Sequence, residues 1–250
     1  MIHKIEWLNH PGRIGETWNP ITGCTPISEG CEHCYAQAMA KRFRMDMTPG
    51  SLETLRLEAP YTWRRPRLVF VGSMCDMFHD GVSAEALSVV MDIIADDMRH
   101  HYVILTKRPR NGIRMLREYY HMDEYPPLWT RRGFDTPRRN LTIGVSVENQ
   151  ARAEERIPEL LLIPAAHRMI SCEPLLGPIE LGDLTGIDWV VCGGETGPGA
   201  RECRPEWAAS IGEQCEAAGV PFSFKKLGNT KAPTCFKPVR QYPKYLEVTP

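Results

Sequence analysis

RLVFVGSMCDMFHDGVSAEALSVVMDIIADDMRHHYVILTKR (67–108) contains a complete strand–helix–strand unit. Its two ends, 67–73 and 102–106, are apolar runs rich in β-branched residues, which predict strands. The segment 83–100 between them has apolar residues at the helical period, at Leu87, Val90, Met91 and Ile94. Strands that are apolar on both faces and alternate with helices are typical of a parallel sheet covered by helices.

The same alternation continues on both sides of this unit. Further strands are predicted at 15–18, 140–146, 167–172, 187–194 and 220–226, and helices at 36–43, 110–121, 149–162 and 205–219. The last helix has Pro205 in its first turn and Gly219 at its end, which are typical helix boundaries. We therefore expect an α/β fold, a single partial (β/α)6-type barrel of parallel strands with helices outside.

Length and composition fit one ordinary globular domain. The chain has 250 residues, of which 42% are hydrophobic and 24% charged, so the composition is not that of a disordered protein. We expect a core at about 16–228, insertions at about 44–66 and 122–139, and a C-terminal tail at 229–250. The insertions are rich in Pro, Arg and aromatic residues. They are either a substrate cover or contact surface, or solvated excursions without a role.

Charge and hydropathy argue against two classes of partner. The 30 Lys and Arg residues balance 31 Asp and Glu residues, which argues against a protein that coats nucleic acid non-specifically. No apolar run approaches the roughly 18 residues that span a bilayer, and the N-terminus lacks the apolar core of a signal peptide. We expect a cytoplasmic protein with no membrane partner.

Polar and charged residues follow each predicted strand. The strand ends carry NPITGC (19–24), SMCD (73–76), TKR (106–108), SVEN (146–149), SCEP (171–174), GGET (193–196) and KKLG (225–228). In (β/α) enzymes the catalytic groups collect at the carboxyl ends of several parallel strands. This edge of the sheet is therefore the predicted active site.

Three of the nine cysteines are crowded near the N-terminus, at Cys24, Cys31 and Cys34, in a C-x6-C-x2-C pattern. Thiolates are soft ligands suited to iron–sulfur clusters or zinc. Three of them can hold three corners of a cubane and leave one iron open, whereas a structural zinc site wants four ligands. A fourth ligand could come from His33 or Cys235, so a structural zinc knuckle stays an alternative.

This loop resembles the cluster loop of the radical SAM superfamily. More closely, the chain is similar to a phage- and prophage-borne three-cysteine family of formerly unassigned function, and more distantly to spore photoproduct lyase. The motifs that carry the resemblance run from about Trp18 to Gly228: TWNPITGCTPISEGCEHCYAQAMAKR, SMCDMFHD, LTKRP, GVSVENQ, SCEPLLGPIEL, WVVCGGETGPGAR and FSFKKLG.

The resemblance implies two cofactors. Cys24, Cys31 and Cys34 would ligate a 4Fe-4S cluster, and S-adenosyl-L-methionine (SAM) would chelate the fourth iron through its amino and carboxylate groups. An external electron donor would reduce the cluster, and SAM would be cleaved to a 5′-deoxyadenosyl radical that abstracts hydrogen from a substrate. The first gap departs from the superfamily pattern, because it has six residues rather than the commoner three.

The resemblance also implies which side chains contact SAM. At the position before the last cysteine, here His33, the superfamily usually has an aromatic residue near the adenine of SAM. The strand-end residues offer groups for the methionyl, carboxylate and ribose parts of SAM. The candidates are His33 and Tyr35 for the adenine, Ser73 and Asp76 for the methionyl or ribose groups, Lys107 for the carboxylate, Ser146, Glu148 and Asn149 for the ribose hydroxyls, and Glu195 of a GGE triplet for the pocket in general.

Cys172 and Glu173 are the candidate catalytic residues. A thiol at a strand end could donate a hydrogen atom to a product radical, as the likeness to spore photoproduct lyase implies, and Glu173 stands beside it. The alternative is that Cys172 is a small residue packed in the barrel rim.

Basic residues concentrate between Arg99 and Asn140. This segment has ten Lys or Arg but only four Asp or Glu, with aromatic residues among them. Such a surface is typical of nucleic-acid binding, and the alternative is a solvated charged face.

We expect a radical SAM enzyme of isomerase type that rearranges or modifies a nucleotide or a modified DNA base of a phage, in the host cytoplasm. The alternatives are a lyase or repair enzyme of spore photoproduct lyase type, and a zinc-stabilised nucleic-acid-binding module.

Overall fold

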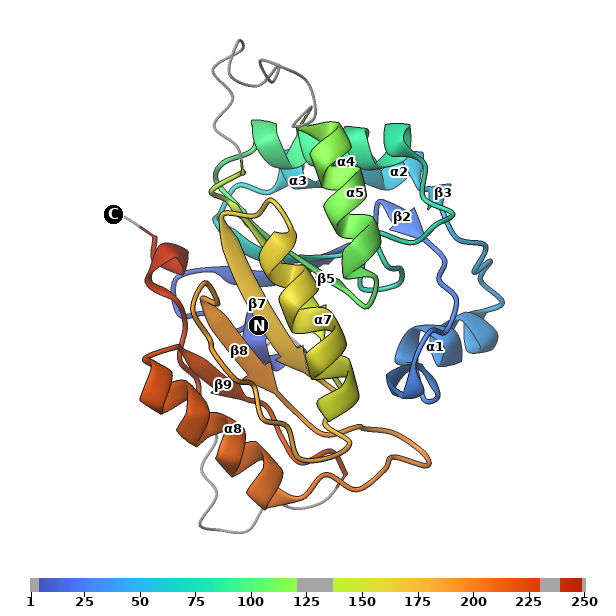
Figure 1. Ribbon diagram of the computed structural model, residues 1–250. Helices are drawn as coiled ribbons and strands as arrows, with labels where there is room; N and C mark the ends of the chain where they lie inside the picture. The colour runs from blue at the N-terminus through green and yellow to red at the C-terminus, as the bar shows by residue number, and fades with distance from the viewer. Residues whose placement is uncertain (1–4, 121–136, 230–238, 249–250) are drawn as a thin grey trace.

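A computed structural model describes residues 5–120, 137–229 and 239–248. Its centre is a sheet of seven parallel strands that curls into a half-barrel (Figure 1). The strands follow one another across the sheet in chain order: β1 (Ile14–Trp18), β4 (Arg67–Val71), β5 (His101–Thr106), β6 (Leu141–Ser146), β7 (His167–Cys172), β8 (Trp189–Cys192) and β9 (Phe222–Phe224). The predicted α/β partial barrel is confirmed.

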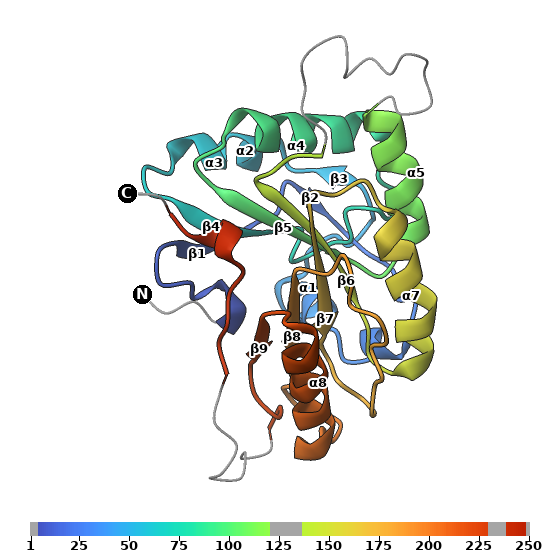
Figure 2. The same cartoon turned by 60° about the vertical axis from the view of Figure 1, so that its left-hand side comes forward.

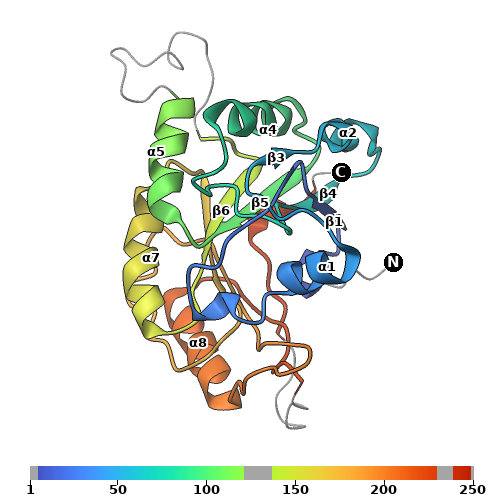
Figure 3. The same cartoon turned by 90° about the vertical axis from the view of Figure 1, so that its right-hand side faces the viewer.

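Helices cover the outer face of this sheet. The main ones are α4 (Ala84–Asp96), α5 (Pro109–Tyr119), α7 (Gln150–Leu162) and α8 (Pro205–Ala218), and Figure 3 shows the last three in a row along the sheet. Each predicted strand and helix is present, with ends that differ by a few residues. One step of the alternation differs, because residues 173–188 join β7 to β8 without a helix.

The first insertion is part of the packed fold. It contributes β3 (Ser51–Leu52), α2 (Thr54–Leu57) and α3 (Ala59–Thr62), and β3 pairs antiparallel with β2 (Ile21–Thr22). The indole Nε1 of the buried Trp18 donates to the carbonyl of Arg56 at 2.8 Å. The 44–66 segment is therefore not a solvated excursion.

The second insertion lies mostly outside the described residues, at 121–136. The described residues on either side of it are the end of α5 and the start of β6, which is the amino edge of the sheet. The predicted active edge is the opposite one. Arg99, Arg110 and Arg114, from the basic region, each pair with an acidic side chain, Asp97, Glu159 and Glu118 respectively.

Alternation along the strands gives the sheet two apolar faces. In β5, Tyr102 and Ile104 pack under the helices, while Val103 packs on the inner face. Trp7 and Leu8 of the short helix η1 (Glu6–Leu8) and Leu246 of η3 (Lys244–Leu246) fill that inner face. Figure 2 shows η1 and η3 on the same side of the sheet. The described C-terminal residues 239–248 thus pack against the half-barrel.

Among the described residues, none of the helices is both long and apolar enough to cross a lipid bilayer.

Candidate cluster and cofactor site

A cavity of about 270 Å³ lies at the carboxyl edge of the half-barrel. Residues at or just after the ends of β4 to β9 line it, among them Ser73, Thr106, Ser146, Ser171, Gly194 and Lys225. Its apolar lining includes Trp7, Phe70 and Leu105. Each of the seven predicted strand ends therefore contributes at least one residue to this site.

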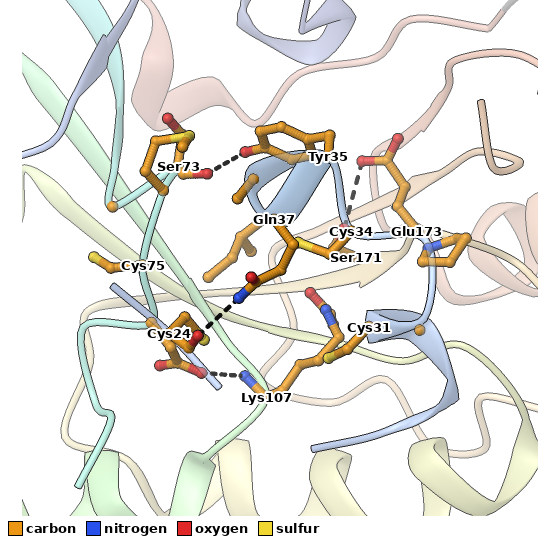
Figure 4. Close-up of a pocket in the computed structure, with 18 of the residues that line it drawn as sticks. Cys24, Cys31, Cys34, Tyr35, Gln37, Ser73, Cys75, Lys107, Ser171 and Glu173 are labelled. Atoms are coloured by element: carbon orange, nitrogen blue, oxygen red, sulfur yellow. Dashed lines mark hydrogen bonds between the residues drawn. The ribbon is translucent and has the colours of Figure 1, made fainter. Parts of the chain in front are cut away.

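Cys24, Cys31 and Cys34 all line this cavity (Figure 4). Gly23, just before Cys24, forms an isolated parallel bridge with Cys75 and has φ +91°. A Cβ at position 23 would lie 2.1 Å from the carbonyl oxygen of Thr48, so only glycine fits there. The first cysteine is thereby fixed beside the end of β4.

The other two cysteines come from a short turn and the start of a helix. Cys31 ends η2 (Glu29–Cys31), and Cys34 is the N-cap residue of α1 (Tyr35–Phe43). Gln37, in the first turn of α1, donates from Nε2 to the carbonyl of Cys24 at 2.9 Å. The helix therefore ties the two ends of the cysteine loop, residues 24–34, together.

A buried guanidinium stands beside the first thiol. Arg108 places Nη1 3.8 Å from the Cys24 sulfur and 3.4 Å from an Asp76 oxygen. Its Nη2 donates to the carbonyl of Thr25 at 2.9 Å. Burial and the Asp76 carboxylate raise the pKa of Cys24 above its ordinary value, and Arg108 opposes this rise without overcoming it. Arg108 is thus placed to stabilise a thiolate at this position.

Asp76 lines the cavity, but its oxygens are occupied by the protein. Oδ1 accepts from the Thr106 hydroxyl at 2.7 Å, and Oδ2 accepts from the backbone N–H of Lys107 at 3.0 Å. The carboxylate therefore joins the ends of β4 and β5 and holds Arg108, rather than presenting a free edge to a ligand.

His33 and Glu195 form a pair at the rim of the cavity. The Nδ1 atom of His33 lies 2.8 Å from a Glu195 oxygen, and Arg201 pairs with the same carboxylate at 2.6 Å. Burial would raise the pKa of Glu195, but hydrogen bonds from Arg201 and His33 outweigh it and lower that pKa to about 2. Glu195 is therefore a carboxylate at neutral pH.

Four further predicted SAM contacts line the cavity: Tyr35, Ser73, Lys107 and Ser146. The half-exposed Tyr35 donates its hydroxyl hydrogen to the carbonyl of Ser73, as Figure 4 shows. The Nζ of Lys107 lies 3.9 Å from Glu148 Oε1 and is partly exposed. Ser146 lines the cavity from the end of β6.

Glu148 and Asn149, the two other predicted ribose contacts, do not line the cavity. Glu148 is fully buried and pairs with Arg156 of α7 at 2.9 Å. Asn149 is the N-cap of α7, and its side chain accepts from the backbone N–H of Arg152 at 3.1 Å. Asparagine suits both a ribose contact and a helix N-cap, so the sequence could not distinguish these two roles for Asn149.

Cys172 is fully buried and is absent from the cavity lining, while its neighbours Ser171 and Glu173 line it. Alternation along β7 turns the Cys172 side chain to the helix-covered face, where burial raises its pKa well above the ordinary value. The structure thus favours the packed residue over the predicted hydrogen donor. Glu173 faces Lys225 at 3.3 Å, and this contact raises the pKa of Lys225.

Three cavity residues belong to predicted strand ends, but the sequence predicted no individual role for them. Arg108, Lys225 and Cys75 stand in the TKR, KKLG and SMCD strand ends, and they line the cavity. Their position after a parallel strand was the available signal. Arg201 lies far along the chain from His33 and Glu32. No local pattern could therefore predict its ion pair with Glu32 or its position beside His33.

The fit of a metal group can be tested on the thiols. Among residues 5–120, 137–229 and 239–248, no three His, Cys, Asp or Glu side chains stand close enough to share one ion. An iron–sulfur cubane takes one thiolate on each iron, so its ligands surround a cluster rather than a point. Three soft thiols on one cavity, one beside a buried cation, fit such a group. Cys235, one of the two suggested fourth ligands, lies outside the described residues.

No curated protein and no solved structure matches this chain significantly. One protein family matches residues 3–242, nearly the whole chain, under the description "protein of unknown function (DUF5131)". The chain therefore belongs to the DUF5131 family.

Proposed function

We propose that this chain is a radical SAM enzyme. The observation that carries the proposal is that Cys24, Cys31 and Cys34 line one cavity at the carboxyl edge of a parallel half-barrel. When bound there, a 4Fe-4S cluster with SAM at its open iron would supply a carbon radical that removes a hydrogen atom from a substrate.

The chain's own residues would prepare this site. Arg108 offsets thiolate charge at Cys24, and Lys107 offers a partly exposed ammonium for the carboxylate of SAM. The apolar lining from Trp7, Phe70 and Leu105 limits water beside the reacting atoms. Glu173 and Lys225, on the β7–β9 side, are polar groups that a substrate would meet.

The proposed reaction is an isomerase-type rearrangement or modification of a nucleotide or a modified phage DNA base. What supports the rearrangement is a single cysteine trio in the sequence, since chemistry such as sulfur insertion often uses a second cluster. The enzyme would work in the host cytoplasm, with an external electron donor.

A lyase or repair reaction of spore photoproduct lyase type is the second enzymatic candidate. It would use a thiol as hydrogen donor, and Cys172 is buried away from the cavity. Of the thiols outside the cysteine loop that the structure describes, Cys75 is the one that lines the cavity.

Anaerobic purification and metal analysis test the proposal. We expect a brown protein with about four irons per chain that cleaves SAM to 5′-deoxyadenosine after reduction. A colourless protein with one zinc per chain would support the nucleic-acid-binding module and overturn the proposal. Incubation of the reduced enzyme with SAM and the nucleosides of phage DNA, followed by mass spectrometry, tests the substrate.

A further inference from the structure

Two carboxylates, each a few residues after a different strand, contact the cysteine loop next to two of its thiols. We propose that Glu148 and Glu195 are positioning residues that hold the loop in its cluster-binding shape before a cluster is present. Glu148 fixes the Cys31 side and Glu195 fixes the Cys34 side. The inference deepens the proposed function and rests on it.

Glu148 acts on the segment just before Cys31. Its Oε1 accepts from the Ser28 hydroxyl at 2.6 Å, and that hydroxyl oxygen lies 3.9 Å from the Cys31 sulfur. A Cβ at Gly30 would lie 2.3 Å from Glu148, so the loop backbone packs directly on the carboxylate. Arg156 holds Glu148 from behind, which leaves the carboxylate one fixed orientation.

Glu195 acts on the segment just before Cys34. It pairs with His33 at 2.8 Å, and Arg201 contacts it three times, through the backbone N–H, Nε and Nη2. The remaining guanidinium nitrogen of Arg201 reaches Glu32 at 2.9 Å. Two neighbouring residues of the loop are therefore joined to the end of β8 through one carboxylate and one guanidinium.

These contacts suit a positioning role because of their strength and their place. Hydrogen bonds between ionised groups are roughly twice as strong as neutral ones. A loop that is ordered beforehand binds its ligand without the entropy cost of ordering at that moment. Groups that orient metal ligands typically change metal affinity by about 10- to 100-fold when they are removed.

Thiol labelling of the metal-free, full-length protein tests the proposal without any cofactor. Iodoacetamide modifies each cysteine, and mass spectrometry gives a rate for each peptide. We expect Ser28→Ala to raise the rate at Cys31 about fivefold, and Glu195→Gln to raise it at Cys34 about fivefold. In each variant the other two loop cysteines should stay within about twofold of wild type.

This site selectivity separates positioning from general loss of stability, which would raise all three rates together. Ser28→Ala stands in for Glu148→Gln, because the latter leaves Arg156 buried without its partner and could prevent folding. Arg201→Met should reproduce the effect of Glu195→Gln. Glu16→Gln is the control, since it breaks a comparable ion pair with Arg67 at 2.8 Å that touches no part of the loop. Equal rates in all variants would overturn the proposal.

The reconstituted protein gives the second readout. Ser28→Ala and Glu195→Gln should lose iron to a chelator about tenfold faster than wild type and Glu16→Gln. A wild-type protein that binds no cluster would overturn the proposed function. The labelling pattern would still test whether Glu148 and Glu195 position the loop. A wild-type cluster with unselective labelling would defeat the positioning role alone.

Discussion

At the end of β7, neighbouring side chains lie on opposite faces of the sheet. Ser171 and Glu173 line the cavity, while Cys172 between them packs under the helices. The two-residue period of a strand thus separates residues that are adjacent in the sequence. The same period places Ser146 in the cavity and Val145 in the outer core. At the scale of single residues, role depends on the face as much as on the residue type.

Four thiols line the cavity, and we expect three of them to ligate iron. Cys31→Ser should lose most of the iron and the SAM cleavage, because a hydroxyl is a poor replacement for a soft thiolate. Cys75→Ser should keep at least about half of the wild-type iron, because Cys75 follows β4 outside the cysteine loop. Iron and sulfide per chain measure both. Equal losses in the two variants would show that Cys75 is a ligand.

The lowered pKa of Glu195 predicts a pH dependence of stability. This carboxylate has a pKa of about 2 in the folded protein against an ordinary value of 4.5. Its contribution is therefore complete above pH 4.5 and is lost as the pH falls toward 2, up to roughly 3 kcal/mol in all. Urea unfolding of the metal-free protein should show Glu195→Gln less stable than wild type at pH 7, and nearly equal to it near pH 2. A difference that stays constant with pH would contradict this assignment.

At the scale of elements, the repeated strand–turn–helix unit needs residues that start each helix. Ser83 and Asn149 both do so, since each side chain accepts from a backbone N–H three residues later, Ala86 and Arg152 respectively. The turn after β6 therefore serves a helix start as well as the cavity edge. This is why SVEN contains one cavity residue, Ser146, and one cap.

Asn149 is a residue at which a cap and a ribose contact make different predictions. Asn149→Ala should lower the free energy of unfolding by about 1 kcal/mol, because a backbone N–H of α7 loses its partner. The affinity for SAM should stay within about twofold. Asn149→Ser should recover most of the stability, because serine also caps helices well. Urea unfolding and equilibrium SAM binding measure the two effects, and a large loss of SAM affinity would restore the ribose contact.

At the scale of the whole molecule, the two ends of the described chain close the inner face of the half-barrel. Tyr242 donates its hydroxyl hydrogen to the carbonyl of Asn9 at 3.0 Å, and Arg13 donates to the carbonyl of Leu246 at 2.8 Å. Tyr245 stacks on His167 of β7 with ring centroids 3.6 Å apart. Side chains from these two segments thereby cover the inner face of the half-barrel. Trp7, from the N-terminal segment, also lines the cavity.

Leu246 measures how much this closure stabilises the fold. Its side chain is fully buried, so Leu246→Ala should cost about 2–5 kcal/mol in the free energy of unfolding. Val248→Ala is the matched control, because Val248 is 39% exposed and should change the stability by less than about 0.5 kcal/mol. Urea unfolding of the two variants compares them directly. Similar values for both would mean that the C-terminal segment does not contribute to the core.

Much of the fold could be predicted because it is written in local periodicity. The apolar runs of β4 to β9 and the helical patterns of α4 to α8 each depend on residues within one element, and their alternation fixes a parallel sheet. The β2–β3 pair could not be predicted, since two-residue strands carry no period. The return of residues 239–248 into the barrel depends on contacts with segments more than 200 residues away, such as Arg13 with Leu246.

The candidate site divides in the same way. The spacing of Cys24, Cys31 and Cys34 and the polar ends of successive parallel strands are local features. The sequence alone therefore predicted soft ligands at one edge of the sheet. Packing decides which of two adjacent strand-end residues faces the cavity. For this reason Cys172, Glu148 and Asn149 do not line it. The ion pairs that grip the cysteine loop join residues up to 169 positions apart, so folding alone brings them together. Charges attract whatever their separation along the chain, and only the folded backbone sets the distance between them.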